Sequence, residues 1–91
     1  MAALACDIVT PTKKLFSAEN VSMVIVPGVE GEMGFLYGHV PLVSALADGT
    51  ARLQFEKEEK EKKFSIKGGY VQVTGKKVIV LADSAEEITE E

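Results

Sequence analysis

The apolar residues of this chain alternate with polar ones at the period of a β-strand, in short runs. The runs are "ACDIVTP" (5–11), "VSMVIVP" (21–27), "ARLQF" (51–55), "KFSIKGGYVQV" (63–73) and "KKVIVLAD" (76–83). Gly, Pro and Asp cluster between them, where turns are needed. There is no βαβ spacing and no internal repeat. The pattern therefore predicts an all-β fold for residues 1–83, a two-sheet antiparallel β-sandwich or flattened barrel.

Two segments depart from the strand pattern. Residues 56–63, "EKEEKEKK", contain only charged side chains and most simply extend a hairpin beyond the sheet, with opposite charges pairing across the strands. A short helix with Glu56 and Lys60 one turn apart is the alternative. In residues 84–91, Ser84 and Glu87 have the spacing of a helix capping box. This spacing predicts the start of a helical segment whose remainder is absent.

Composition narrows the function. A chain of 91 residues forms about one domain, and a net charge of -4 with a pI near 5.0 argues against nucleic acid as a partner. No stretch approaches the roughly 20 apolar residues of a membrane span, so we expect no direct membrane insertion. One His and one Cys cannot form a zinc cluster, and Cys6 is interpreted as a buried small side chain. We expect no catalytic residue, no metal and no cofactor.

The stretch "PGVEGEMGFLYGHVP" (27–41) concentrates glycine, two prolines and the single histidine. Glycines leave the backbone accessible and prolines stiffen the ends, so the stretch predicts a rigid tip that carries the charges of Glu30 and Glu32. The two carboxylates are close enough to act as an acid and base, but solvated carboxylates are the simpler interpretation. For His39 we favour a structural or interface role over catalysis. The tip is typical of a docking loop for a basic partner.

Several segments together resemble the epsilon subunits of F-type ATP synthases. They are "DIVTP" (7–11), "VPGVEGEMGFL" (26–36), "GHVPLV" (38–43), "GGYVQV" (68–73) and "VIVLADSAE" (78–86), in order along nearly the whole chain. The resemblance implies the amino-terminal β-sandwich domain of a non-catalytic rotor subunit, with the gamma subunit and the c ring as partners. It also implies a peripheral location at the cytoplasmic face of the bacterial inner membrane, or at an equivalent energy-transducing membrane.

The resemblance also implies roles for individual residues. By motif match, Gly31, Glu32 and Met33 contact the c ring, while Thr10, His39 and Ser44 lie on or near the surface that faces gamma.

Two positions differ from the family pattern. Tyr37 stands where members commonly have Pro, which predicts a looser turn or an added apolar contact. The chain also stops before the carboxy-terminal helical hairpin that most members carry, so we expect neither inhibition by that hairpin nor its ATP binding. The alternative function is a swinging-arm carrier of the lipoyl or biotinyl type, modified on Lys76 or Lys77 in a hairpin turn.

Overall fold

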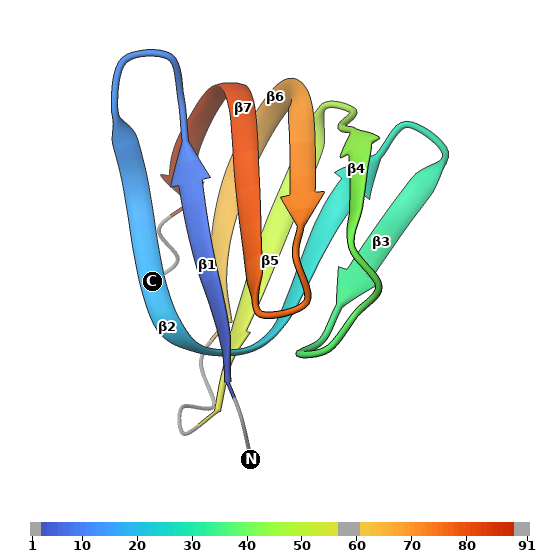
Figure 1. Cartoon of the computed structure of the whole chain (residues 1–91). Helices are drawn as coiled ribbons and strands as arrows, with labels where there is room; N and C mark the ends of the chain where they lie inside the picture. Colours follow the sequence, from blue (N-terminus) through green and yellow to red (C-terminus); the bar gives the residue numbers. More distant parts are fainter. Residues whose placement is uncertain (1–2, 57–60, 89–91) are drawn as a thin grey trace.

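The computed structural model describes residues 3–56 and 61–88, which form a 7-stranded sheet and contain no helix (Figure 1). The strands are β1 (Leu4–Val9), β2 (Lys14–Gly28), β3 (Gly31–Phe35), β4 (Leu42–Ala45), β5 (Gly49–Phe55), β6 (Glu61–Val73) and β7 (Lys77–Ile88). The prediction of an all-β fold is confirmed. Within the described ranges no helix has the length and hydropathy needed to cross a bilayer.

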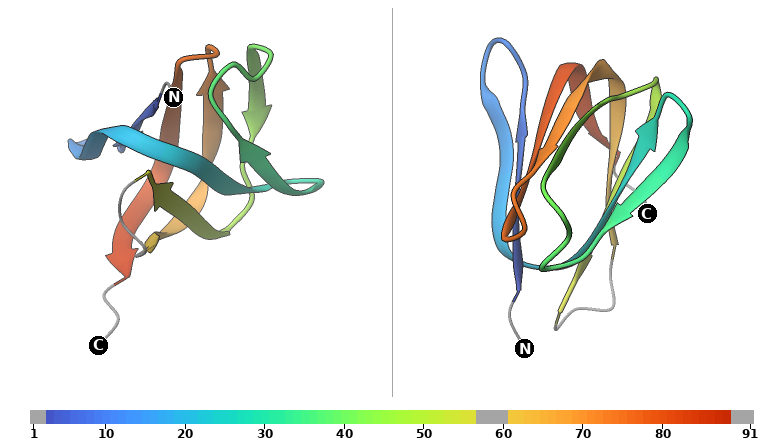
Figure 2. Two further views of the ribbon diagram at one scale, coloured as in Figure 1. Left: turned by 90° about the horizontal axis from the view of Figure 1, so that it is seen from below. Right: turned by 45° about the vertical axis from the view of Figure 1, so that its right-hand side comes forward.

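The strands curve into two facing layers because the longest of them, β2, β6 and β7, pair with different neighbours along their lengths (Figures 1 and 2). The β4 layer consists of β4, the second half of β6, the first half of β7, β1 and the start of β2. The β5 layer consists of β5, β3, the rest of β2, the first half of β6 and the end of β7. The sandwich is antiparallel as predicted, except that β1 and β7 run parallel.

Strand alternation directs one side of each layer into a common core. The buried apolar residues are Leu4, Cys6, Ile8, Val21, Val24, Val26, Phe35, Leu46, Ala51, Leu53, Phe55, Phe64, Ile66, Val71, Val73, Val78, Val80 and Ala82. Burial, with a smaller contribution from the charge of Asp7, raises the pKa of the Cys6 thiol to about 12. The interpretation of Cys6 as a buried small side chain is confirmed, because a protonated thiol in the core is chemically inert.

The β6 and β7 strands pass from one layer to the other at a bend formed by Gly68 and Gly69 (Figure 1). Both have positive φ, 64° and 107°, a region that L side chains rarely adopt. A Cβ at Gly69 would collide with the carbonyl oxygen of Leu81 and lie 2.8 Å from the Cα of Ala82. The two glycines therefore let β7 lie close to β6 at the bend, where the paired strands leave one layer and enter the other.

The predicted helix start at Ser84 is wrong for the described residues, because β7 continues as a strand to Ile88. Ala85 lies opposite Ile66 and packs against the core. Lys62 Nζ forms an ion pair with Glu87 Oε2 at 2.9 Å. A capping box contributes only about 1 kcal/mol to a helix of so few turns. The backbone pairing offered by β6 outweighs that local signal.

The charged segment lies partly outside the described residues, which exclude 57–60. On its two sides, Gln54 and Glu61 lie opposite each other in β5 and β6, and the Gln54 side chain donates a hydrogen bond to Glu61 at 3.1 Å. Residues 61–63 thus belong to a hairpin strand as predicted. The alternative helix depends on Lys60, which is not described.

Candidate functional site

The acidic tip is a β-hairpin rather than the loop that the sequence suggested. β2 runs through Pro27 to Gly28, Val29 and Glu30 form the turn, and β3 starts at Gly31. A Cβ added to Gly28 would lie 2.7 Å from the carbonyl oxygen of Gly31. The φ of Gly31 is 123°. The close approach requires glycine at position 28, whereas Gly31 has no atom within 4 Å of an added Cβ and is favoured by its positive φ. The tip projects from the end of the sandwich that also carries the β1–β2 turn (Figure 1).

Glu30 and Glu32 are both exposed on this hairpin, and Glu32 is the one with an ion-pair partner. It lies opposite Pro27 in the sheet, and its side chain is 60% exposed. An Arg52 nitrogen on β5 donates to both carboxylate oxygens, at 3.2 and 3.4 Å. Beside it, Met33 turns toward the core and is only half-exposed. Arg52 therefore orients the Glu32 carboxylate on the hairpin surface while leaving it accessible.

Thr10 lies in the β1–β2 turn, where its hydroxyl donates to the carbonyl of Lys13 at 3.2 Å. The same turn is closed by backbone bonds between these two residues. Thr10 directly follows Val9, the last residue of β1. Its hydrogen bonds are those of a turn residue, so any contact with a partner would come from its position at the edge of the β4 layer.

His39 lies in the connection from β3 to β4, at the opposite end of the sandwich. Its Nδ1 is 2.8 Å from the carbonyl oxygen of Val40, and its ring meets Phe35 edge-on at 5.0 Å. A bond of 2.6 Å from Gly38 N–H to the carbonyl of Gly75 ties this connection to the β6–β7 turn. These contacts support the structural role predicted for His39.

Ser44 occupies the middle of β4, opposite Val71 of β6. Thr10, His39 and Ser44 do not contact one another. Thr10 lies at one end of the β4 layer, His39 lies at the other end, and Ser44 lies on strand β4. Ser44 shares its side of the layer with buried Val71 and so faces inward, which means that the three predicted gamma-facing residues form neither a pocket nor one outward surface.

Sequence reasoning missed an apolar row on the outward side of the β4 layer. Cross-strand register places Ala45, Tyr70, Leu81 and Val9 side by side on β4, β6, β7 and β1. Tyr70 is 57% exposed and Leu81 43%. The signal was available in "YVQV" and "VIVL", where apolar residues occupy outward as well as inward positions of the strands.

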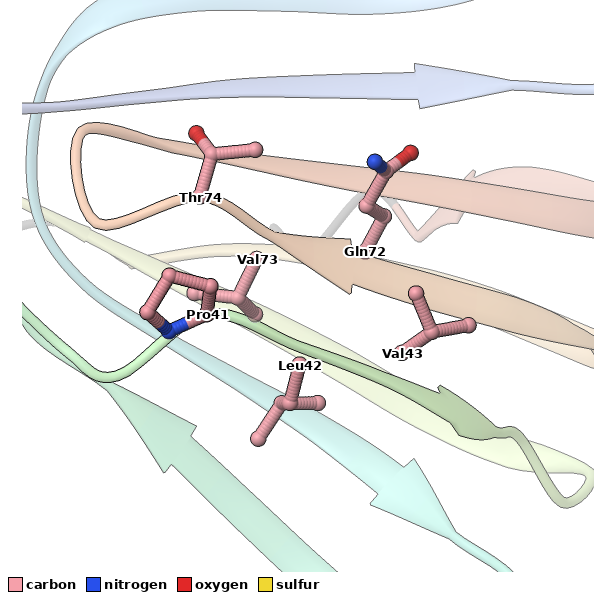
Figure 3. Close-up of a pocket in the computed structure, with 6 residues that line it drawn as sticks. All are labelled: Pro41, Leu42, Val43, Gln72, Val73 and Thr74. Carbon is pink, nitrogen blue, oxygen red and sulfur yellow. The ribbon is translucent and has the colours of Figure 1, made fainter.

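A second row runs parallel to the first, with Val43 opposite Gln72 and Ile79 between Gln72 and Asp7. Val43 is 66% exposed. It borders a shallow pocket of about 330 Å³ between β4 and the end of β6 (Figure 3). The residues that line this pocket are Pro41, Leu42, Val43, Gln72, Val73 and Thr74. We call the two rows together the apolar face.

Asp7 is the one buried charged residue in the described part of the chain. Lys77 contacts its carboxylate at 2.9 Å, Lys14 at 3.6 Å, and the Ser17 hydroxyl donates to it at 2.7 Å. Burial alone would raise the pKa of Asp7, but the Ser17 hydrogen bond and the charges of Lys77 and Lys14 outweigh burial and lower it. The group is a stable carboxylate that links β1 to β2 and β7, and all of its partners hold it in the ionised form.

Two features of the described surface are suited to binding a partner. Within residues 3–56 and 61–88 no group of three or more His, Cys, Asp and Glu side chains could hold a metal. Glu30 and Glu32, considered above as an acid and base, are both exposed, and Glu32 is paired with Arg52. What the surface offers is an acidic hairpin at one end and the apolar face along one layer.

Comparison with known proteins identifies the family. The family described as "ATP synthase, Delta/Epsilon chain, beta-sandwich domain" matches residues 3–88. An ATP synthase epsilon chain of Desulforamulus reducens is 46% identical over 80 residues, covering 88% of this chain and 58% of the relative. That of Dehalococcoides mccartyi strain BAV1 is 43% identical over 90 residues, covering 99% of this chain and 62% of the relative. The chain thus spans about three-fifths of the length of these curated relatives.

Solved structures agree with this assignment. A chain in the Euglena gracilis mitochondrial ATP synthase structure, described as OSCP/F1/c-ring, superposes with a TM-score of 0.87 at 26% identity, covering 96% of this chain and 54% of that one. A chain of the Tetrahymena thermophila central stalk and c ring has a TM-score of 0.76 at 16% identity, which shows the shared fold. The carrier alternative is set aside, because the match over residues 3–88 is to a different family. The chain belongs to the ATP synthase delta/epsilon family and contains its β-sandwich domain.

Proposed function

We propose that this chain is a non-catalytic central-stalk subunit that links the gamma subunit to the c ring during proton-driven ATP synthesis. The observation that carries the proposal is the family match over residues 3–88. The similarity to a chain in a structure described as containing F1 and a c ring supports it. The protein would be held at the energy-transducing membrane through its partners, at the cytoplasmic face in a bacterium.

The c-ring contact is proposed for Gly31, Glu32 and Met33, where β3 leaves the hairpin turn. Glu32 would form a charge-assisted hydrogen bond to a basic residue of a c-ring loop. Because Arg52 already fixes the direction of the carboxylate, little side-chain entropy would be lost when the partner arrives. Such a contact favours correct register and rapid assembly more than raw affinity.

The gamma contact is proposed for the β4 layer, on which Thr10, His39 and Ser44 are distributed. A subunit placed between ring and gamma must transmit torque without deforming. Continuous backbone pairing across β4, β6, β7 and β1 makes this layer a stiff plate. Its core side is close-packed, which resists compression.

The proposal is tested by adding the purified chain to c rings in detergent with and without bound gamma, and measuring retention on the ring. We compare the original sequence with Glu32→Lys and with Glu86→Lys, a matched charge reversal at an exposed position of β7 remote from the hairpin tip. Glu32→Lys should reduce retention on the ring by about tenfold or more, and Glu86→Lys by less than about twofold. Failure of the folded original chain to be retained on either assembly would contradict the proposal.

A further inference from the structure

The β2–β3 hairpin that carries the acidic tip holds two methionines, and each lies over a glycine of the neighbouring strand. Met33 on β3 covers Gly28: a Cβ added to Gly28 would lie 2.8 Å from Met33 Cε and 3.5 Å from Met33 Cγ. Met23 on β2 covers Gly34 in the same way, with its Cε 2.8 Å from the position of an added Cβ. Each thioether therefore occupies the space that a side chain at the facing glycine would take.

The two methionines lie on opposite sides of this hairpin. Met33 is paired with Val26, which is fully buried, and it packs against the core. Met23 is paired with Gln54, whose side chain is exposed on the outward side of the β5 layer. Both methionines are partly exposed, so a small oxidant can reach either sulfur. Of the two, Met33 is the one whose sulfur side chain borders the core.

Thioethers are oxidised by hydroperoxides in a balanced two-electron step. A sulfur lone pair attacks the terminal peroxide oxygen, the S–O bond forms and the O–O bond breaks. The departing oxygen takes the proton of the transferred hydroxyl and leaves as water or as an alcohol. The product is methionine sulfoxide, a polar group that methionine sulfoxide reductases convert back to the thioether. Cys6 does not compete for the oxidant, because its thiol is buried and stays protonated.

We propose that Met33 is a site of reversible oxidation by hydroperoxides, and that its sulfoxide loosens the acidic hairpin. The added oxygen is held against apolar side chains of the core, where a polar group without a hydrogen bond is costly. The oxidised side chain therefore turns toward water and uncovers Gly28. A sulfoxide at Met23 already faces water on the outward side of the hairpin, so it leaves the hairpin unchanged.

The base of the hairpin reports its conformation. Val29 N–H donates to the carbonyl of Ala45 at 3.4 Å, and Ala47 N–H donates to the carbonyl of Pro27 at 2.8 Å. When the hairpin loosens, these bonds open more often and their amide protons exchange faster with water. The Glu32 carboxylate, next to Met33, then samples more directions, which raises the entropic cost of binding a partner. This last consequence rests on the proposed function, whereas the oxidation and the loosening do not.

The test uses two chains that each keep one of these methionines. Met23→Leu leaves Met33, and Met33→Leu leaves Met23; leucine nearly conserves volume and resists this oxidation. Each folded chain is treated with hydrogen peroxide, and peptide mass spectrometry locates every added oxygen, about 16 Da each. The double variant Met23→Leu/Met33→Leu controls for oxidation elsewhere, including at Met1.

Amide hydrogen exchange of Ala47 is measured before and after oxidation. In the Met23→Leu chain, oxidation of Met33 should accelerate this exchange by about tenfold or more, and sulfoxide reductases should restore it. In the Met33→Leu chain, oxidation of Met23 should change it by less than about twofold. The inference is overturned if Met33 resists peroxide in the folded chain, if its sulfoxide leaves Ala47 exchange unchanged, or if Met23 oxidation has the same effect.

Retention on c rings in detergent is measured for the same samples. Oxidation of the Met23→Leu chain should lower retention by about fivefold, reversibly, and oxidation of the Met33→Leu chain should not. If the folded, unoxidised original chain is not retained, the proposed function fails, while the exchange experiment still decides whether Met33 controls the hairpin. If the original chain is retained and oxidised Met33 loosens the hairpin without lowering retention, the link between oxidation and ring contact is wrong and the proposed function stands.

Discussion

The outward sides of the two layers differ sharply in chemistry, although β6 and β7 contribute to both. On the β4 layer these strands present Tyr70 and Leu81 to solvent. On the β5 layer, beyond the glycine bend, the same strands present Ser65 and Glu86 opposite each other. The change occurs within one strand pair and at one bend, so it does not reflect a general preference of these strands for apolar residues.

The outward side of the β5 layer carries two exposed polar pairs, Arg52 with Glu32 and Gln54 with Glu61. A third pair, Lys62 with Glu87, lies at the rim of the layer, on the side that Leu53 and Phe64 turn toward the core. Pairs of this kind keep a surface soluble and contribute little to folding. The apolar face has the opposite character, since its apolar residues lie outside the core and Val43, Tyr70 and Leu81 are exposed. The outward side of the β5 layer thus presents polar pairs to water, whereas the outward side of the β4 layer exposes apolar area that folding alone does not require.

The bend between the two surfaces is the most sensitive point of the fold. In Gly69→Ala, the new Cβ would meet backbone atoms of Leu81 and Ala82, and the positive φ of 107° would be strained. Because backbone cannot yield as a flexible side chain does, we expect a loss of more than about 3 kcal/mol of unfolding free energy, or failure to fold. Urea unfolding followed by circular dichroism measures this.

Gly75→Ala is the control for that experiment. Gly75 also has a positive φ, 93°, but an added Cβ would be 3.6 Å from its nearest atom, the carbonyl oxygen of His39. Backbone strain alone should cost about 1–2 kcal/mol. Equal losses for the two variants would show that crowding at the bend does not hold the layers together.

The Asp7 cluster is the next most important, because its contacts tie β1 to β2 and β7. Asp7→Asn removes a buried charge that two lysines and Ser17 contact, and it should lower the unfolding free energy by about 2–3 kcal/mol at pH 7. Ser17→Ala, which leaves both ion pairs, should cost about 1 kcal/mol. Thermal unfolding of the three proteins gives the order, and a larger loss in Ser17→Ala would contradict it.

The same cluster predicts a pH dependence. Since the folded state lowers the pKa of Asp7, its contribution is complete above the unfolded value of about 4 and is lost as pH falls through the folded value. The stability difference between the original chain and Asp7→Asn should therefore be constant from pH 6 to 7 and shrink below about pH 4. A difference that grew on acidification would show that the folded pKa is raised instead.

Much of the fold could be predicted from the sequence because alternation is a local signal. The strand core around 51–55 and 63–73 follows directly from its apolar positions. What could not be predicted depends on partners distant in the chain: β4 is a strand because it pairs with β6, and Ser84–Ile88 extends β7 because the first half of β6 lies beside it. The parallel pairing of β1 with β7 is likewise a property of the closed arrangement.

The candidate site, like the fold, could be predicted from the sequence only in part. The acidic tip was visible in "PGVEGEMG", since glycine spacing and charge are local features, although its hairpin geometry was not. The segments "YVQV" and "VIVL" signalled outward apolar residues, but not that Ala45, Tyr70, Leu81 and Val9 are neighbours, which follows only from the register of four strands. Recognition of the apolar face needed the folded arrangement.

The exposed residues of the apolar face should matter little for folding. In the double variant Tyr70→Ser and Leu81→Ser, little buried area is lost, because 57% and 43% of these residues are already exposed. We expect a change in unfolding free energy of about 1 kcal/mol or less, reflecting mainly lower β-propensity. Chemical denaturation measures it, and a loss comparable to that of Asp7→Asn would mean that the face belongs to the core and not to an interface.

The smallest effect is expected on the β5-layer surface, at the ion pair that orients the acidic tip. Arg52→Met keeps an unbranched apolar stem and removes the 3.2 Å contact with Glu32, whose side chain is 60% exposed. Solvent screens such a pair, so the unfolding free energy should fall by no more than about 0.5 kcal/mol, and by less in high salt. Lys62→Met, which removes the exposed 2.9 Å pair with Glu87 together with the contact of Lys62 Nζ over the Phe16 ring at 5.7 Å, provides the comparison. If the two variants are equally stable but only Arg52→Met weakens retention on the c ring, the pair orients the tip for binding. If Arg52→Met costs more than about 1 kcal/mol, the pair is instead a structural tie between β3 and β5, and the contrast between the two faces is smaller than their side chains suggest.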